Sequence, residues 1–231
     1  MPPEKVPHDV SAIRKELELF LKNADAAGRK VSNAKCGVYV FYDYDGEPIY
    51  VGQTKEQLRV RIRRHLTNQR TDAVAMNVLD PFEVAEVEVY PFYDLQVPEK
   101  GEDKKTHEQR IAKTLAAAEY SVFQKVLRES ALKAVLNEKK IPRSNIIELP
   151  ESFRGKIIPE NIYHLRKHPD VRIARRASTV ANLARVISER DVSPGLRRTL
   201  LTQARRLERL ASQRLEDFKN SADSPEESSE S

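Results

Sequence analysis

The sequence predicts an α/β protein of the α+β kind, in which a small mixed domain precedes an α-helical module rich in basic residues. Two short β-rich runs, residues 37–42 and 48–51, are joined by a turn signal at residues 43–46. Residues 82–92 alternate apolar and polar side chains like a strand. Together these segments predict a three-stranded, mainly antiparallel sheet. After Pro142 the β-rich runs stop and arginine-rich helical spacing takes over.

Helical spacing of apolar residues predicts the elements around the sheet. The expected helices cover residues 8–28, 55–67, 106–128, 160–168, 171–190 and 194–218, with a charged loop at 98–105. The last helix has a clear start, because Ser193 suits the N-cap and Pro194 the first helical position. We therefore expect a helical extension over 1–30, the sheet domain over 31–142, a basic helical module over 143–219 and a disordered acidic tail over 220–231.

The totals favour a soluble, cytoplasmic protein. No run approaches the roughly 18 apolar residues that a membrane helix needs, and the first residues lack the apolar stretch of a secretory signal. The single cysteine, Cys36, excludes an intrachain disulfide and a cysteine zinc cluster. A metal in this protein would therefore need oxygen or imidazole ligands.

The positive charge is concentrated in the second half of the chain. The net charge of the protein is +5; residues 143–219 carry 17 Lys and Arg against 9 Asp and Glu, and residues 220–231 carry none against 4. A basic block of this kind favours a polyanion, most often a nucleic acid, through phosphate contacts. The alternative is a solvated, arginine-rich helical surface.

Two tyrosines of the predicted hairpin share one face. Depending on the turn, Tyr39 lies opposite Tyr50 or opposite Gly52, and in both cases the two phenols stay together because side chains alternate along a strand. Gly52 leaves room beside them. Taken alone, such a pair is typical of ordinary cross-strand packing.

The following helix adds a guanidinium and an imidazole. Arg61 and His65 lie four residues apart on one flank of the apolar stripe. This pair suits holding a phosphate and relaying a proton near neutral pH, although basic helices also carry such pairs on plain surface.

A glutamate interrupts the apolar stripe of the long helix. Glu119 lies four residues after Leu115 and four before Phe123, where a carboxylate is costly unless it is paired or binds a cation. A single glutamate can bind Mg²⁺ when waters and a substrate phosphate supply the other ligands. A salt bridge is the alternative explanation, and Glu108 is a weaker candidate near the helix start.

These residues resemble the signature of the GIY-YIG endonuclease family. The first motif reads Gly37-Val-Tyr39 and the second Tyr50-Val-Gly52, with valine in place of the central isoleucine in both. Arg61 with His65, Glu119 and the Leu136-Asn137 pair follow in the order of the family. The resemblance covers about residues 36–140.

The resemblance implies hydrolysis of a DNA phosphodiester bond with one divalent metal ion, Mg²⁺ or Mn²⁺. Glu119 would anchor the metal and Arg61 would hold the scissile phosphate. Tyr39, assisted by His65, or else Tyr50, would accept a proton from the attacking water. Such a phenol needs nearby cations to lower its pKa from about 10. Asn137 would hold the site or the DNA backbone through hydrogen bonds.

In this family a separate part of the chain usually binds DNA, and residues 145–218 are the candidate here. The arginines expected to contact phosphates are Arg172, Arg175, Arg176, Arg197, Arg198, Arg205 and Arg206. The apolar stripes of the same helices also allow packing within the chain or a homodimer. Restriction-type or mobile-element cleavage is favoured over repair, and a non-catalytic nucleic-acid-binding protein with this scaffold is the alternative.

Overall fold

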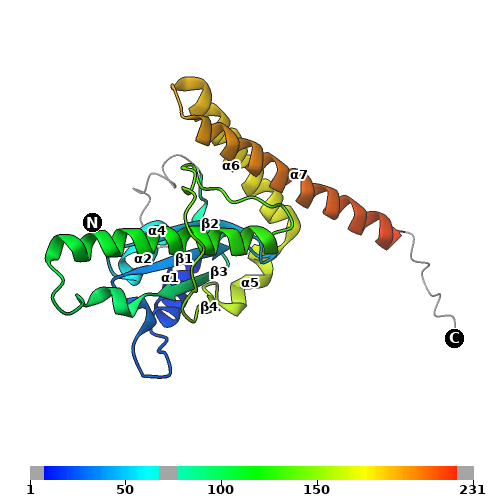
Figure 1. Cartoon of the computed structure of the whole chain (residues 1–231). Helices are drawn as coiled ribbons and strands as arrows, with labels where there is room; N and C mark the ends of the chain where they lie inside the picture. Colours follow the sequence, from blue (N-terminus) through cyan, green and yellow to red (C-terminus); the bar gives the residue numbers. More distant parts are fainter. Residues whose placement is uncertain (1–7, 68–77, 223–231) are drawn as a thin grey trace, which may run out of the picture.

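A computed structural model describes residues 8–67 and 78–222 of the chain (Figure 1). Its elements follow the order α1 (His8–Phe20), β1 (Gly37–Tyr42), β2 (Pro48–Thr54), α2 (Leu58–Thr67), β3 (Glu86–Pro91), α4 (Lys104–Glu129), β4 (Phe153–Lys156), α5 (Glu160–Lys167), α6 (Pro169–Glu189) and α7 (Pro194–Ala222). The predicted α+β class is confirmed. Within the described residues, no helix is both long and apolar enough to cross a membrane.

The sheet is antiparallel and has one strand more than predicted. Its order is β2-β1-β3-β4, so β1 and β3 are central and β2 lies at one edge. The fourth strand, β4, comes from the segment between Pro142 and the helix expected from residue 160, for which the sequence predicted no strand. It is short and alternates exposed and half-buried residues, which leaves little apolar pattern to detect. The sheet therefore extends past the expected boundary at residue 142.

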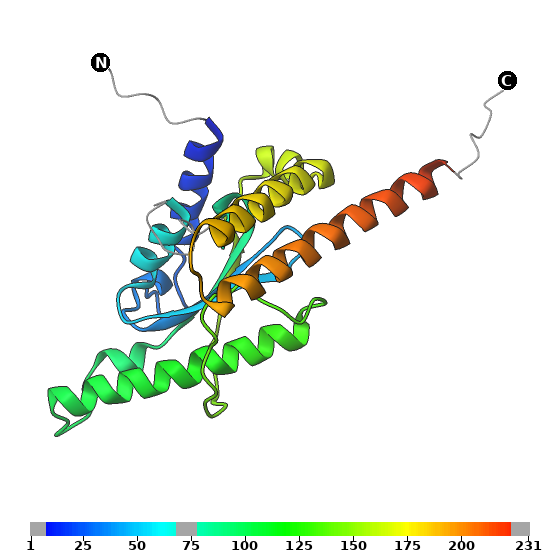
Figure 2. The ribbon, with the colours of Figure 1, turned by 90° about the horizontal axis from the view of Figure 1, so that it is seen from above.

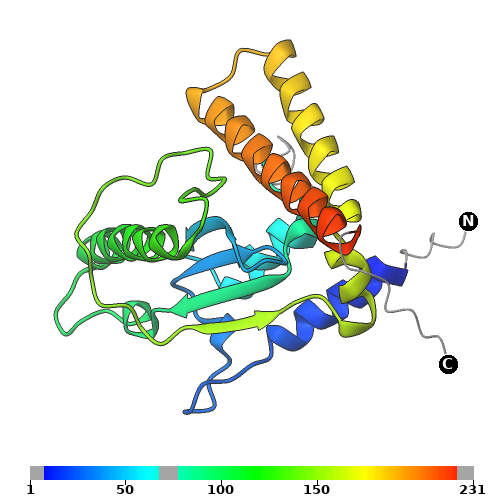
Figure 3. The ribbon, with the colours of Figure 1, turned by 90° about the vertical axis from the view of Figure 1, so that its right-hand side faces the viewer.

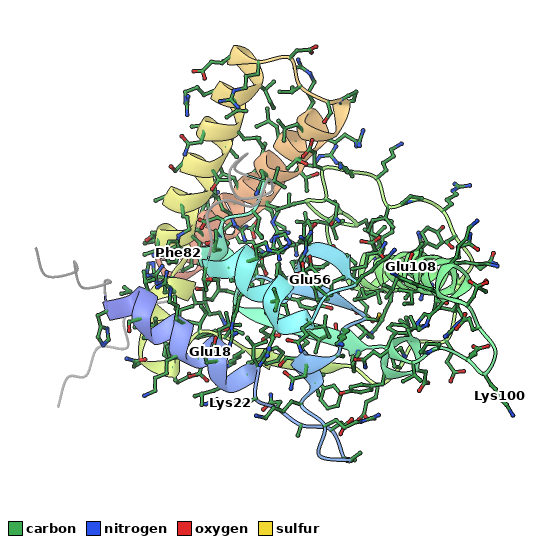
Figure 4. All side chains as sticks on the ribbon, turned by 90° about the vertical axis from the view of Figure 1, so that its left-hand side faces the viewer. Glu18, Lys22, Glu56, Phe82, Lys100 and Glu108 are labelled. Atoms are coloured by element: carbon green, nitrogen blue, oxygen red, sulfur yellow. The ribbon has the colours of Figure 1, made fainter. Side chains whose placement is uncertain are left out.

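Different helices cover the two faces of the sheet (Figures 1 and 3). On one face Val38 and Val40 of β1 pack against Ala118 and Val122 of α4. On the other face the core contains residues of α1, α2, α6 and α7; these include Leu17, Ile62, Leu183 and Leu196 together with Tyr39 and Phe41 of β1. An ion pair between Glu18 and Arg63 joins α1 to α2. Figure 4 labels Glu18 on α1. β1 thus lies between two apolar layers.

Two elements are shorter than predicted, and a side chain closes a turn in the part of each prediction that the element leaves out. The first helix ends at Phe20 rather than at residue 28, and the Asp25 carboxylate closes a separate turn by accepting the backbone N–H groups of Ala27 and Arg29. The third strand starts at Glu86 rather than at residue 82, because Asp80 caps a short 3-10 turn. The acidic tail expected from residue 220 begins inside α7 and otherwise lies outside the described residues.

A buried ion cluster joins the C-terminal helices to the β1–β2 turn. Asp43 Oδ2 accepts hydrogen bonds from Arg176 Nη2 at 2.8 Å, Arg206 Nη2 at 2.5 Å and Arg172 Nη2 at 3.4 Å. We call the following residues the Asp43 cluster: Asp43, Asp45, Glu83, Arg172, Arg176 and Arg206. Three carboxylates thus compensate three guanidinium groups.

The cluster corrects part of the sequence-based assignment of DNA contacts. The side chains of Arg172, Arg176 and Arg206 are only 1%, 5% and 3% exposed, and each already forms ion pairs with carboxylates. Arg175 is half-buried and pairs with Glu83. A buried, paired guanidinium cannot contact a DNA phosphate in this arrangement. These arginines therefore hold the fold together.

The helical spacing of the cluster explains its burial. On α6 the buried residues are Arg172, Arg176, Thr179, Leu183 and Val186, which repeat at intervals of three or four. On α7 Arg206 falls in the same way between Gln203 and Leu210. The arginines therefore lie in the buried stripe, and this signal was present in the sequence.

We predict that Arg206→Met destabilises the fold by roughly 3 kcal/mol, because removing one partner of a buried ion cluster leaves charge uncompensated. Denaturant unfolding measures the difference. The matched control is the adjacent, exposed Arg205, for which Arg205→Met should stay within about 0.5 kcal/mol of the wild type. Equal stability of the two variants would contradict a structural role for the cluster.

Candidate active site

The hairpin places the two tyrosines of the predicted motifs side by side. Tyr39 pairs with Gly52 across the strands, and a register shift lies between Phe41 and Tyr42. The rings of Tyr39 and Tyr50 stack with their centroids 6.2 Å apart. Of the two registers that the sequence allowed, the structure therefore has the one with Tyr39 opposite Gly52, with both phenols on one face.

Gly52 is required by the position of the Tyr39 hydroxyl. A Cβ atom at residue 52 would lie 2.5 Å from Tyr39 Oη and 2.9 Å from Tyr50 Cε1, which is closer than non-bonded atoms approach. The space that glycine leaves is thus filled by the Tyr39 phenol itself. The glycine of the second motif packs against the tyrosine of the first.

Arg61 and His65 of α2 both reach the Tyr39 hydroxyl. The Arg61 Nε–H donates to Tyr39 Oη at 3.2 Å, and His65 Nε2 lies 3.0 Å from the same oxygen. His65 is 2% exposed, and its Nδ1 atom is buried with no hydrogen-bond partner among the described residues. The flank predicted from the helical spacing therefore faces the tyrosines.

Burial decides the protonation of these groups. Desolvation, together with the positive charges of Arg61 and Arg64, lowers the pKa of His65 to about 4, so the imidazole is neutral near pH 7. Burial also raises the pKa values of Tyr39 and Tyr50, even though Arg61 opposes the rise. The sequence required cations to lower the pKa of the phenol, but in this structure desolvation outweighs the single nearby guanidinium. Both tyrosines are therefore protonated and His65 can accept a proton.

Glu119 reaches the edge of the sheet beside β2. Its Oε2 atom accepts a hydrogen bond from Gln53 Nε2 at 3.1 Å, and no described residue forms an ion pair with it. Burial raises the pKa of Glu119, and hydrogen bonds from Gln53 oppose the rise. The carboxylate also acts electrostatically on Tyr39 and Tyr50. The structure thus brings the glutamate to the tyrosines without a neutralising partner.

Glu108 lies apart from this site, whereas Gln53 belongs to it. Glu108 is exposed near the start of α4, where it pairs with Lys104 at 4.0 Å, and Figure 4 labels it on the helix. Glu108 is therefore not in the cluster around Tyr39. Gln53 is the residue that sequence reasoning missed, and its place directly after Gly52 was the available signal.

Asn137 covers the outer edge of β2. Its side chain accepts the N–H of Val51 at 3.0 Å and donates to the carbonyl of Val51 at 2.6 Å, while the N–H of Leu136 donates to the carbonyl of Ile49. The asparagine thus makes the two backbone hydrogen bonds with Val51 that a neighbouring strand would otherwise make. In this structure its amide is occupied by the backbone.

The donor set around Glu119 fits a hard cation bound by few protein ligands. Among the described residues, no group of three or more His, Cys, Asp or Glu side chains is arranged to hold a metal ion. A lone carboxylate, half-buried and held by a neutral amide, suits Mg²⁺ or Mn²⁺, because these ions keep several waters and bind substrate phosphate. Glu119 fits that role.

Comparison with protein families agrees with this geometry. Residues 35–121 match the family model of the GIY-YIG catalytic domain. This part of the chain is a GIY-YIG domain. The matched range includes Tyr39, Tyr50, Arg61, His65 and Glu119, and it ends before Asn137. No curated protein and no solved structure matches the chain significantly.

The GIY-YIG domain confirms the resemblance inferred from the motifs and indicates a nuclease-type fold. The family model matches neither the N-terminal helix α1 nor the C-terminal helices α5, α6 and α7.

We predict that His65 makes the fold sensitive to acid. The pKa of His65 is about 6.5 in the unfolded chain and about 4 in the folded protein. The contribution of neutral His65 to the free energy of unfolding is therefore fully present above pH 6.5 and is lost as the pH falls toward 4. Between pH 7.5 and 5 this amounts to about 2 kcal/mol. Denaturant unfolding at the two pH values measures it.

Between pH 7.5 and 5, the free energy of unfolding of the His65→Gln variant should fall by about 2 kcal/mol less than that of the wild type. The exposed His164 provides the control, since His164→Gln should retain the pH dependence of the wild type. An identical loss in His65→Gln and wild type would show that His65 is not the group responsible.

Proposed function

We propose that the protein is a metal-dependent endonuclease that hydrolyses phosphodiester bonds of DNA. The observation that carries this proposal is the contact of Tyr39 with both His65 and Arg61, next to the Glu119 carboxylate, which forms no ion pair with a described residue. A structural role explains a buried tyrosine, but it does not require a neutral imidazole, a guanidinium and a lone glutamate around it. The reaction needs each of them.

Arg61 is suited to binding the scissile phosphate. It is half-buried beside the two phenols, and its positive charge meets the charge that develops on the phosphate in the transition state. Glu119 would hold Mg²⁺ or Mn²⁺, which when bound neutralises charge on the phosphate and stabilises the leaving oxygen. The two residues would thus act on the same phosphate.

Tyr39 and His65 are suited to removing the proton from the attacking water. The water proton would pass to Tyr39 Oη while the phenol proton passes to His65 Nε2, so that no free tyrosinate forms. A phosphate bound by Arg61 would draw the guanidinium away from Tyr39 and offset one of the charges that keep the pKa of His65 low. Substrate binding would thereby make His65 a better acceptor. Tyr50, which is half-buried, would position the water.

We favour restriction-type or mobile-element cleavage over repair, and a cytoplasmic location. The apolar stripes of α6 and α7 pack within the chain, as the burial of Leu183, Leu196 and Leu210 shows. A homodimer through the C-terminal helices would therefore need other residues than these.

We predict that Glu119→Gln lowers the rate of supercoiled-plasmid cleavage by about 100-fold or more, because the metal ion loses its carboxylate ligand. DNA binding measured in chelator should be unchanged. Glu108→Gln is the control on the same helix and should cleave like the wild type. If the wild type binds DNA but never cleaves it with Mg²⁺ or Mn²⁺, the protein is instead a non-catalytic binder on this scaffold.

A second pair of variants distinguishes the tyrosines. Tyr39→Phe should lower kcat by about 10² or more, the contribution of a general base, with DNA affinity retained. Tyr50→Phe should lose less, because it removes only a positioning hydrogen bond. Single-turnover cleavage of a labelled duplex measures both, and a larger loss in Tyr50→Phe would assign the base to Tyr50.

A further inference from the structure

We propose that Lys139, Lys140, Arg198, Arg205 and Arg209 form one surface, the basic rim, that binds the phosphates of duplex DNA beside the cut. The inference rests on the proposed function, because it names where the substrate of the same site lies. It also replaces the expected DNA contacts that the Asp43 cluster removes.

Two lysines lie close to the active site along the chain. Asn137 is hydrogen-bonded to Val51, between the motif residues Tyr50 and Gly52. Lys139 and Lys140 follow two and three residues later, so Lys139 lies within about 7 Å of chain from Asn137. Both lysine side chains are exposed.

The start of α7 packs against the same segment. A Cβ atom at Gly195 would lie 2.1 Å from the backbone oxygen of Glu138, and Ser193 Oγ donates to Glu138 Oε1 at 3.0 Å. The glycine therefore lets the helix approach the segment that carries the lysines. Figure 2 shows α7 starting beside the chain that follows α4 and running outward from there.

Three arginines of α7 lie on the flank of the helix next to that segment. At 3.6 residues per turn, Arg198 lies about 60° around the helix from Gly195, and Arg205 and Arg209 follow on the same flank. Arg205 and Arg209 also line a groove with Leu132 of the segment after α4. Arg197 lies about 160° from Gly195 and is therefore on the opposite flank.

The charges of the rim are available to a ligand. None of its five cations forms an ion pair with a described residue, whereas exposed Arg185 and Arg154 pair with Glu189 and Glu86. Three carboxylates lie on this side: Glu138 accepts a hydrogen bond from Ser193, Glu208 accepts one from Ser212, and Glu216 lies at the outer end of the groove. The five cations of the rim outnumber these three carboxylates, so the net charge of this surface is positive.

The dimensions suit a duplex. Arg198 and Arg209 are eleven residues apart, which is about 16 Å along the helix. Phosphates of one DNA strand repeat every 3.4 Å along the axis, so the row spans roughly five of them. A duplex lying along α7 would pass Lys139 and Lys140 and reach Arg61 and Glu119.

Salt-dependent binding tests the rim. Anisotropy of a labelled 30-base-pair duplex is measured in chelator at several salt concentrations, and the slope of log affinity against log salt reports the phosphates contacted. Arg198→Gln with Arg205→Gln should reduce the magnitude of the slope by about 1.8, or 0.9 for each lost contact, and Lys139→Gln with Lys140→Gln should do the same. Exposed side chains make folding of these variants easy to verify by thermal unfolding.

The control pair, Arg185→Gln with Arg190→Gln, removes the same charge from exposed positions of α6 and its C-cap and should leave the slope unchanged. An equal change in the control pair, or no change in the rim variants, would overturn the proposal. Because no metal is present, the outcome is independent of cleavage. A rim that binds in a protein that never cleaves would refute the nuclease function alone.

Discussion

Asp43 is the residue through which the two parts of the molecule depend on each other. One carboxylate oxygen accepts the backbone N–H groups of Asp45 and Glu47 and so shapes the β1–β2 turn, while the other accepts three guanidinium groups from α6 and α7. A buried guanidinium is tolerated only beside a carboxylate. The turn therefore fixes the helices, and the helices fix the turn. Tyr39 and Tyr50 stand on the same hairpin, so the active site inherits this constraint.

Desolvation is the second determinant of the site. The same apolar layer that encloses Tyr39 keeps both phenols protonated and His65 neutral, which gives a proton donor and a proton acceptor in contact. Glu119 lies at the edge of this layer, where β2 ends the sheet and a ligand can approach. The buried interior thus sets the protonation states of the tyrosines and His65, whereas the edge of the sheet with Glu119 is where a substrate can bind.

Much of the fold and site could be predicted because it depends on local patterns. Alternation and turn residues predicted the hairpin, helical spacing predicted the helices, and motif order placed Glu119 with the tyrosines. The short strand β4 was not predicted, because its sequence has almost no apolar alternation. Arg172, Arg176 and Arg206 were assigned to DNA because their number suggested a surface, although their spacing placed them in the buried stripe. For arginine, position within the helical period was the better guide than composition.

The sequence by itself determined the GIY-YIG domain, the shared face of Tyr39 and Tyr50, and the flank of Arg61 and His65, since these follow from the periods of strands and helices. Only the tertiary structure decided which arginines pair with carboxylates, which protonation states the tyrosines and His65 adopt, and that Gln53 is the partner of Glu119. The physical reason is that desolvation and ion pairing depend on which distant segments surround a group. Asp43 meets Arg206 across 163 residues of chain, and no local pattern specifies that contact.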